Sequence, residues 1–277
     1  MTTPAARITS LRHATSSALR RGPVRRAVQW RRHQGLDPAD VFLASYPKSG
    51  NTWLRHLVTI ALTGRPTEWR GDLEQVSTRI GLHAGLKPTL SNGGRLIKTH
   101  EQWRPHYGRS VLLVRHPLDV LMSEWSYQAN YSKRFPEYRG SFEVFVKRFA
   151  GGTTNSYGSW DAHTRSWLDL DDHSDTLVLR FEDLRSDPGA VLSRVLTFIG
   201  HDDHRHVDLA VADTTLESMK SKEARYWAAR NADSPGFVRS GGSGDWAASL
   251  TAEQVALVTA SSARGLELAG YSLDGSR

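Results

Sequence analysis

The apolar positions follow two patterns along the chain. Short, largely apolar runs predict buried strands at residues 41–45, 96–99, 111–115 and 176–180. Longer segments with apolar residues three and four positions apart predict helices at residues 52–62, 118–130, 142–149, 157–168, 190–199 and 252–263. Strands that alternate with helices are typical of an α/β fold, so we expect three layers, with a mostly parallel central sheet flanked by helices.

Three polar side chains follow predicted strands directly. Lys48 comes just after strand 41–45, His100 follows strand 96–99, and Arg115 ends strand 111–115. Ligands of parallel sheets bind at the carboxyl ends of the strands, which share one edge. We therefore expect these three side chains to converge on one site.

The turn between the first strand and the first helix has the features of a phosphate site. The sequence YPKSGNT at 46–52 places a lysine, a serine and a glycine where the strand ends and the helix begins. Converging backbone N–H groups, the positive end of the helix and the charge of Lys48 all favour a bound phosphate. Lys48 precedes Gly50, which is not the Walker order, so this run alone leaves the nucleotide open.

The same run resembles the 5′-phosphosulfate loop of the sulfotransferases that use 3′-phosphoadenosine 5′-phosphosulfate (PAPS). Residues 114–123 are similar to the 3′-phosphate segment of that family, and IKTH at 97–100 resembles the segment with its catalytic histidine. Three shorter matches and a C-terminal loop fall in the family's order, at 157–160, 181–184, 198–200 and 237–246. The resemblance spans roughly residues 40–250. It implies a P-loop-like fold and a single sulfotransferase domain over residues 36–277.

The resemblance also implies catalytic roles. His100 would be the general base, in keeping with a side chain whose pKa is ordinarily near neutral. Lys48 would stabilise the bridging oxygen as the sulfur–oxygen bond breaks, and Lys98 would neutralise sulfuryl oxygens in the same space. No metal is expected, because a sulfuryl group carries less charge than the γ-phosphoryl group that Mg²⁺ neutralises in kinases.

The nucleotide contacts divide between the two phosphates and the base. Arg115 offers a forked donor pair to the 3′-phosphate, and Ser123 lies two turns into the next helix. Ser240 stands where the family usually has lysine, and Leu216 stands where an aromatic often stacks on adenine. The full set of expected PAPS contacts is Lys48, Ser49, Gly50, Asn51, Thr52, Trp53, Arg115, Ser123, Tyr157, Thr214, Leu216, Arg239, Ser240 and Gly241.

Other polar residues are assigned no role. We expect Asp119 and Glu124 to be ordinary helix charges, and the histidines of 163–173 and 201–206 to lie on the surface.

The acceptor is expected to be a small molecule with a phenolic, lipidic or glycosidic hydroxyl. Its pocket is predicted from residues 69–90, 101–106 and 125–138 together with the glycine-rich loop 236–244, read as a flexible flap.

The amino-acid composition limits the number of domains and the class of protein. The 277 residues are 39% hydrophobic and include no cysteine, which fits one large domain without disulfides. No apolar run is long enough to cross a bilayer, so a cytoplasmic enzyme is the expectation.

The net charge of +7 belongs to the N-terminus. Residues 1–33 hold eight arginines and no acid, whereas the remainder carries 28 basic and 29 acidic residues. We predict a basic extension over residues 1–35, with no nucleic-acid partner. It is either solvated or a helix packed on the domain, and the alternative is a weak contact with a membrane surface or a carrier-borne substrate.

Two other functions are also compatible with the residues. A P-loop-type kinase would require ATP and Mg²⁺ but neither Arg115 nor Ser123. A non-catalytic adaptor would bind polyanions through the arginine-rich N-terminus without nucleotide selectivity. The sequence leaves the oligomeric state open.

Overall fold

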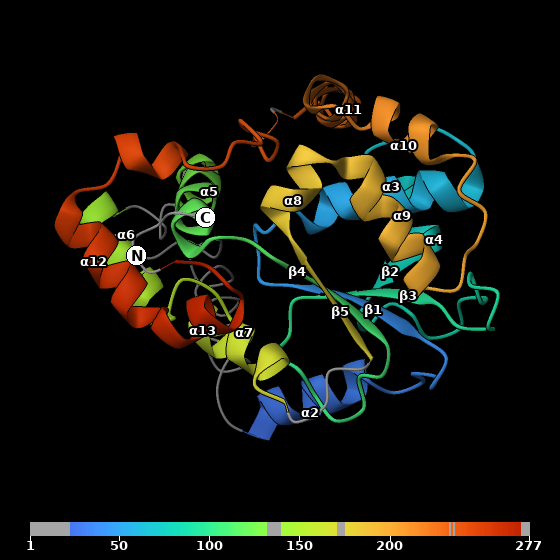
Figure 1. Cartoon of the computed structure of the whole chain (residues 1–277), viewed down its shortest axis with the longest axis horizontal. Helices are drawn as coiled ribbons and strands as arrows, with labels where there is room; N and C mark the ends of the chain where they lie inside the picture. The colour runs from blue at the N-terminus through green and yellow to red at the C-terminus, as the bar shows by residue number, and fades with distance from the viewer. Residues whose placement is uncertain (1–22, 132–139, 171–174, 233, 235, 273–277) are drawn as a thin grey trace, which may run out of the picture.

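A five-stranded parallel sheet organises the chain. The computed structural model describes residues 23–131, 140–170, 175–232, 234 and 236–272 (Figure 1). The sheet order is β2-β3-β1-β4-β5, and all four pairings are parallel. The strands are β1 (Val41–Ser45), β2 (Ser77–Arg79), β3 (Leu96–Thr99), β4 (Ser110–Val114) and β5 (Thr176–Arg180).

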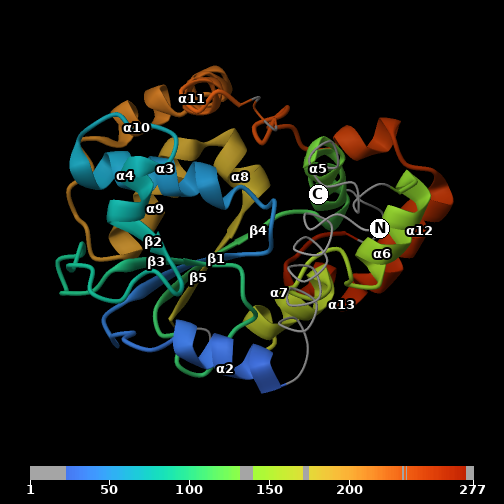
Figure 2. The ribbon, with the colours of Figure 1, turned by 180° about the vertical axis from the view of Figure 1, so that it is seen from behind.

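Alternate residues of the strands face two separate apolar cores, one on each side of the sheet. Val41 and Leu43 of β1 face one core, and Phe42 and Ala44 face the other. The first core receives α3 (Asn51–Thr63), α9 (Pro188–Phe198) and α10 (Val207–Asp213), with α4 (Gly71–Val76), α8 (Phe181–Ser186) and α11 (Leu216–Ala228) nearby. The second lies under α5 (Pro117–Tyr131), α6 (Phe142–Ala150), α7 (Trp160–Leu168), α12 (Ala252–Ser261) and α13 (Ala263–Leu268), as Figure 2 shows from behind. The predicted three-layer α/β fold is confirmed.

The sequence located all four predicted strands within one residue but missed β2. Its three residues, Ser77 to Arg79, are polar or charged, so no apolar run marks it. Its place in the sheet comes from pairing with β3. The short helices α4, α8 and α10 and the longer α11 were also missed. The helix predicted at 252–263 ends at Ser261, with α13 following.

The described part of the basic extension packs on the domain. Helix α2 (Pro23–Arg32) ends where Arg32 donates a hydrogen bond to the Ile80 carbonyl and pairs with Glu101. His33 is 2.8 Å from the Tyr107 hydroxyl. The packed-helix alternative therefore holds for α2, while residues 1–22 lie outside the described residues, and the boundary at residue 35 stays a prediction. In the described chain, no helix is both long and apolar enough to cross a membrane.

Several histidines lie in the interior, which corrects one prediction. His163 was expected on the surface, but α7 buries it, and burial lowers its pKa to about 3. Burial likewise lowers the pKa of His56 to about 3 and that of His116 to about 4. These rings are neutral in the folded protein at neutral pH.

This burial predicts acid sensitivity. An unfolded histidine binds a proton below about pH 6.5, whereas these folded ones do so only near pH 3–4. Stability is therefore fully present above about pH 6.5 and falls by about 1.4 kcal/mol per pH unit for each such histidine below it. Urea unfolding across this range is the measurement. His56→Gln should reduce the slope, and a flat profile for the unsubstituted protein would contradict the prediction.

Candidate functional site

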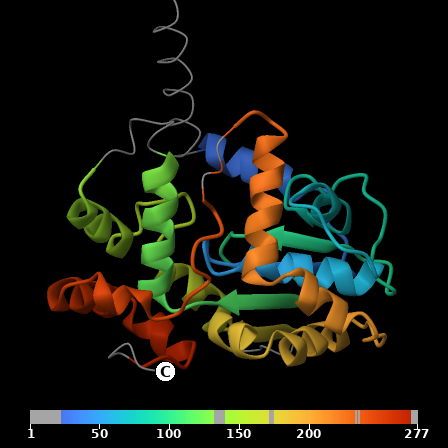
Figure 3. The ribbon, with the colours of Figure 1, turned by 90° about the horizontal axis from the view of Figure 1, so that it is seen from above.

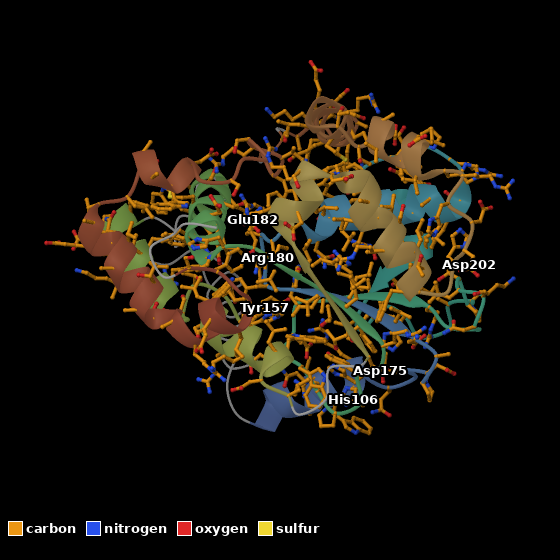
Figure 4. The ribbon with its side chains drawn as sticks, viewed as in Figure 1. His106, Tyr157, Asp175, Arg180, Glu182 and Asp202 are labelled. Atoms are coloured by element: carbon orange, nitrogen blue, oxygen red, sulfur yellow. The ribbon has the colours of Figure 1, made fainter. Side chains whose placement is uncertain are left out.

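The carboxyl ends of the strands open into a cavity of about 550 Å³. Figure 4 shows Arg180 and Glu182 at this end of β5 and Asp175 at the opposite end. Every predicted site residue except Ser49 and Tyr157 lines the cavity. The sheet therefore brings together side chains that are more than 190 positions apart in the sequence, from Lys48 to Gly241.

The turn after β1 has a conformation that its residues enforce. Gly50 has a φ of 96°, and a Cβ there would lie 2.6 Å from the ring of Phe181, so only glycine fits. The Asn51 side chain donates to the Leu43 carbonyl (3.0 Å) and fastens the turn to β1. The Ser49 hydroxyl is buried and has no hydrogen-bond partner among the described residues.

Lys48 is held in a largely apolar environment. Its φ of 70° is in the left-handed region, uncommon for a lysine, and its Nζ lies 3.8 Å from the ring centre of Phe237 and 4.3 Å from that of Tyr127. Burial lowers the pKa of Lys48 to about 7, and the charge of Glu124 partly offsets this effect. A bound phosphate would favour the charged form.

The tautomer of His100 follows from its hydrogen bond. Its Nδ1 is 2.7 Å from the Ser45 carbonyl oxygen, which can only accept, so Nδ1 carries the proton and Nε2 keeps its lone pair. Burial and then the charge of Lys98 hold the pKa of His100 well below its usual range. His100 is therefore neutral at physiological pH and can accept a proton at Nε2.

Lys98 lines the same cavity one residue before the end of β3. Burial lowers its pKa to about 7, and the nearby Arg55 and Arg79 lower it further. Lys98 and His100 thus line one cavity, and the role expected for Lys98 stays a prediction.

Arg115 lies at the end of β4 and fastens the cavity wall. It donates to the Lys48 carbonyl (3.1 Å) and to the Gly242 carbonyl (2.7 Å), and its guanidinium lies over Phe181. Its Nε is buried without a partner in the described chain. Burial lowers the pKa of Arg115, as expected for a cation that lacks a bound anion.

The base-binding side is built around Trp53. Its Nε1 donates to the Thr214 hydroxyl (3.1 Å), and its ring meets that of Phe181 edge-on at 6.0 Å. Leu216 lies two residues after Thr214 and also lines the cavity. Tyr157 was expected here too, but its ring lies 5.6 Å from that of His100 instead.

Buried carboxylates anchor the loop 236–244 at both ends. Glu223 of α11 accepts hydrogen bonds from the backbone N–H groups of Phe237 and Val238. Asp119 of α5 accepts from the Gly244 N–H (3.0 Å) and from the Ser243 hydroxyl. Figure 3 shows the green α5 and the orange α11 on either side of the chain that carries this loop.

The prediction that Asp119 and Glu124 are ordinary helix charges is thus wrong. Asp119 is only 2% exposed, and burial raises its pKa. Glu124 is also buried, accepts from Asn155 (3.1 Å), and is the main charge that offsets the desolvation of Lys48. Neither was identified from the sequence, because each accepts a hydrogen bond from a residue more than 30 positions away.

Arg185 is a further cavity residue that sequence reasoning missed. It lies on α8, lines the cavity, and donates to the Gly241 carbonyl. Ser240, where the family usually has lysine, instead donates to Asp245, which also pairs with Arg239. Arg185 therefore brings a cation to the part of the cavity that lacks this lysine.

Among the described residues, no three histidine, aspartate or glutamate side chains are grouped so that they could hold a metal ion. The expectation of a metal-free reaction stays a prediction.

A family model for the sulfotransferase domain matches residues 38–266 of this chain. The chain belongs to the sulfotransferase family. The family prediction and the PAPS-dependent sulfotransferase activity that it implied are thereby confirmed, and the kinase and adaptor alternatives are not supported.

The sequences of individual relatives match this chain along most of their length. Dog sulfotransferase 1A1 is 27% identical over 262 residues, covering 85% of this chain and 86% of its own. Human sulfotransferase 2A1 is 26% identical over 233 residues, covering 78% and 80%.

Solved structures show the same fold. Retinol dehydratase in complex with retinol and adenosine 3′,5′-bisphosphate (PAP) superposes with a TM-score of 0.63 at 20% identity, covering 84% of this chain and 82% of its own. Mouse sulfotransferase SULT7A1 with PAP gives 0.61 at 23% identity, with coverage of 84% and 87%.

The anchoring of the loop predicts a proteolysis phenotype. Asp119→Ala removes charge-assisted hydrogen bonds to Gly244 and Ser243, each worth about 1.5–3 kcal/mol. Trypsin should then cut after Arg239 at least about tenfold faster. Glu143→Gln, at an exposed position on α6, is the control. Equal cleavage rates for Asp119→Ala and the unsubstituted enzyme would show that this carboxylate does not restrain the loop.

Proposed function

We propose that this sulfotransferase transfers the sulfuryl group of PAPS in line to a small-molecule hydroxyl, with His100 Nε2 accepting the hydroxyl proton. The observation that carries the proposal is the shared cavity. The unprotonated Nε2 of a buried, neutral His100 opens into the same space as Lys48 and Arg115. A base and two cations with unmet charge are the parts that sulfuryl transfer needs.

The residues present fit the nucleotide. Ser49 Oγ and Arg115 Nε are buried and unpartnered in the described chain, and a phosphate oxygen would accept from both. The turn at 48–52 with Lys48 would hold the 5′-phosphate. Arg115 with Ser123 would hold the 3′-phosphate, with Arg185 on the same side of the cavity. Trp53 and Leu216 would flank the adenine.

PAPS supplies a sulfuryl group on a leaving phosphate: the acceptor oxygen bonds to sulfur as the bond from sulfur to the 5′-phosphate oxygen breaks. His100 takes the acceptor proton at Nε2, while the Ser45 carbonyl keeps Nδ1 protonated and the ring oriented. Lys48 neutralises the charge that grows on the leaving oxygen. Lys98 lies on the His100 side and would face the sulfuryl oxygens.

The acceptor half of the cavity has aromatic walls. Trp69, Tyr127, Trp227 and Phe237 line it, and all of these except Trp227 fall in the stretches predicted from sequence. The predicted stretch 101–106 does not line the cavity, and 132–139 lies outside the described residues. We propose that the acceptor presents a flat or apolar body to these rings.

A thermal-shift comparison tests the donor. PAP at about one hundred times its Kd should stabilise the enzyme by about 2.7 kcal/mol, a shift of several degrees in Tm. AMP lacks the 3′-phosphate and should shift Tm much less. A larger shift with ATP–Mg²⁺ than with PAP would overturn the donor assignment.

His100→Asn tests the base. Removing the proton acceptor should lower kcat by about a hundredfold or more, since general-base catalysis contributes about 10²–10⁴-fold. PAP affinity should change little. His106→Asn is the matched control, because this exposed histidine lies beside α2 (Figure 4) and not in the cavity. Near-normal turnover in His100→Asn would refute the role.

Arg115→Met tests the 3′-phosphate subsite. PAP should bind about tenfold to a hundredfold more weakly, while AMP affinity should stay nearly constant. Calorimetric titration of both nucleotides gives the comparison. Equal losses for PAP and AMP would place Arg115 at a different phosphate.

A further inference from the structure

Three arginines line the cavity in positions that the transfer reaction does not use. Arg55 comes from α3, Arg70 directly precedes α4, and Arg79 ends β2. Together with Lys98 they form what we call the β2-side cations. All four share the cavity with His100.

The sheet order separates these cations from the nucleotide. Arg79 ends β2 and Arg115 follows β4, and β3 and β1 lie between these two strands. Three strand spacings of about 4.8 Å place the two backbones roughly 14 Å apart. One phosphate at Arg115 therefore does not reach Arg79. His100, at the end of β3, lies between them, so the β2-side cations face the acceptor.

The carboxylates of the described residues do not balance their positive charge. Glu74 is the carboxylate beside them, and its Oε1 lies 3.1 Å from Arg79 Nε and 3.4 Å from Arg55 Nη2. Arg70 instead lies over the ring of Tyr226. One carboxylate thus faces three guanidinium groups and Lys98, an excess of positive charge inside a partly desolvated cavity.

The pKa values respond to this excess. Burial lowers the pKa of Arg55 to about 10, and the charges of Arg79 and Arg70 contribute to the decrease. The same arginines add to the effect of burial on Lys98. A neutral acceptor would leave this repulsion in place, whereas an anion between the side chains would remove it.

The individual arginines differ in what they are free to do. Arg55 is only 4% exposed and is occupied by the Ser77 hydroxyl and by the Leu73 and Ser77 carbonyls, so it holds β2 and α4 against α3. Arg79 is about half exposed at its side chain, and Arg70 is also exposed. Arg70 and Arg79 are therefore available to a ligand, with Arg55 as a fixed charge behind them.

We propose that the acceptor of this enzyme carries an anionic group, a carboxylate or a phosphate or sulfate ester, which Arg70 and Arg79 bind while its hydroxyl faces His100. The aromatic walls at Trp69 and Phe237 contact the body between the two groups. The proposal rests on the sulfuryl transfer proposed above and specifies its acceptor.

Binding to the PAP-saturated enzyme tests this directly, because PAP occupies the nucleotide phosphate sites first. The probes are 4-hydroxyphenylacetate, 4-hydroxyphenyl phosphate and the uncharged 4-hydroxyphenylacetamide, each titrated by calorimetry. The better of the two anions should bind about tenfold or more tightly than the amide. Comparing the two anions distinguishes a carboxylate site from a phosphate site.

Substitutions then identify the residues that cause the preference for an anion over the amide. Arg79→Gln and Arg70→Gln should each remove most of the difference between anion and amide, and Arg79→Lys should retain part of it. Arg225→Gln removes a charge from exposed α11 outside the cavity and should keep the full preference. Anion binding by the unsubstituted enzyme should also take up protons above about pH 7, where Lys98 is deprotonated in the free enzyme.

The two proposals fail in different ways. Failure of PAP to bind in the first titration overturns the donor assignment. Normal PAP binding followed by equal affinity for anion and amide, or by no binding of either anion, overturns the anionic acceptor alone.

Discussion

The site depends on cations that the fold partly desolvates and that have no carboxylate in an ion pair with them among the described residues. Lys48, Lys98 and Arg115 all lie at the carboxyl edge of one parallel sheet, and burial lowers the pKa of each. Desolvation of an unpaired charge is unfavourable, so the free enzyme is stabilised less than its packing alone would allow. A bound nucleotide supplies the missing negative charge. On the proposed function, the same unpaired charge that makes the free enzyme less stable is therefore the source of nucleotide affinity.

Carboxylates are present around this site, but they hold its walls and not its cations. Asp119 and Glu223 bind backbone N–H groups at the two ends of the loop 236–244, and Glu124 binds Asn155. Had any of them paired directly with Lys48 or Arg115, it would compete with a phosphate for the same cation. The hydrogen bonds of Asp119 and Glu223 to backbone amides keep the loop in place over the cavity while leaving the cations to the ligand.

Local signals in the sequence were enough for much of the fold and for finding most of the residues that line one side of the cavity. β1, β3, β4 and β5 each form an apolar run, and each phosphate-binding segment is contiguous, as in the turn from Lys48 to Thr52. The parts that were missed depend on distant residues. β2 consists of three polar residues whose conformation comes from pairing with β3. Asp119 has the sequence context of an ordinary helix charge, and only the fold shows that it accepts a hydrogen bond from the Gly244 N–H. Arg185 carries no motif at all and enters the site because α8 follows directly on β5.

The strand that the sequence missed also ends in Arg79, one of the two arginines proposed to bind the acceptor. Read across the sheet, the ends of β4 and β1 carry Arg115 and Lys48, to which we assign the nucleotide phosphates. The end of β3 carries the proposed base His100, and β2 at the edge ends in Arg79. An inner strand is restricted on both sides by its neighbours, whereas an edge strand pairs on one side only. Residues at the end of β2 can therefore change without disturbing the donor site, since β3 and β1 separate them from it. In a parallel sheet whose donor half is fixed by phosphate chemistry, the edge strand is the position where the acceptor can be selected independently.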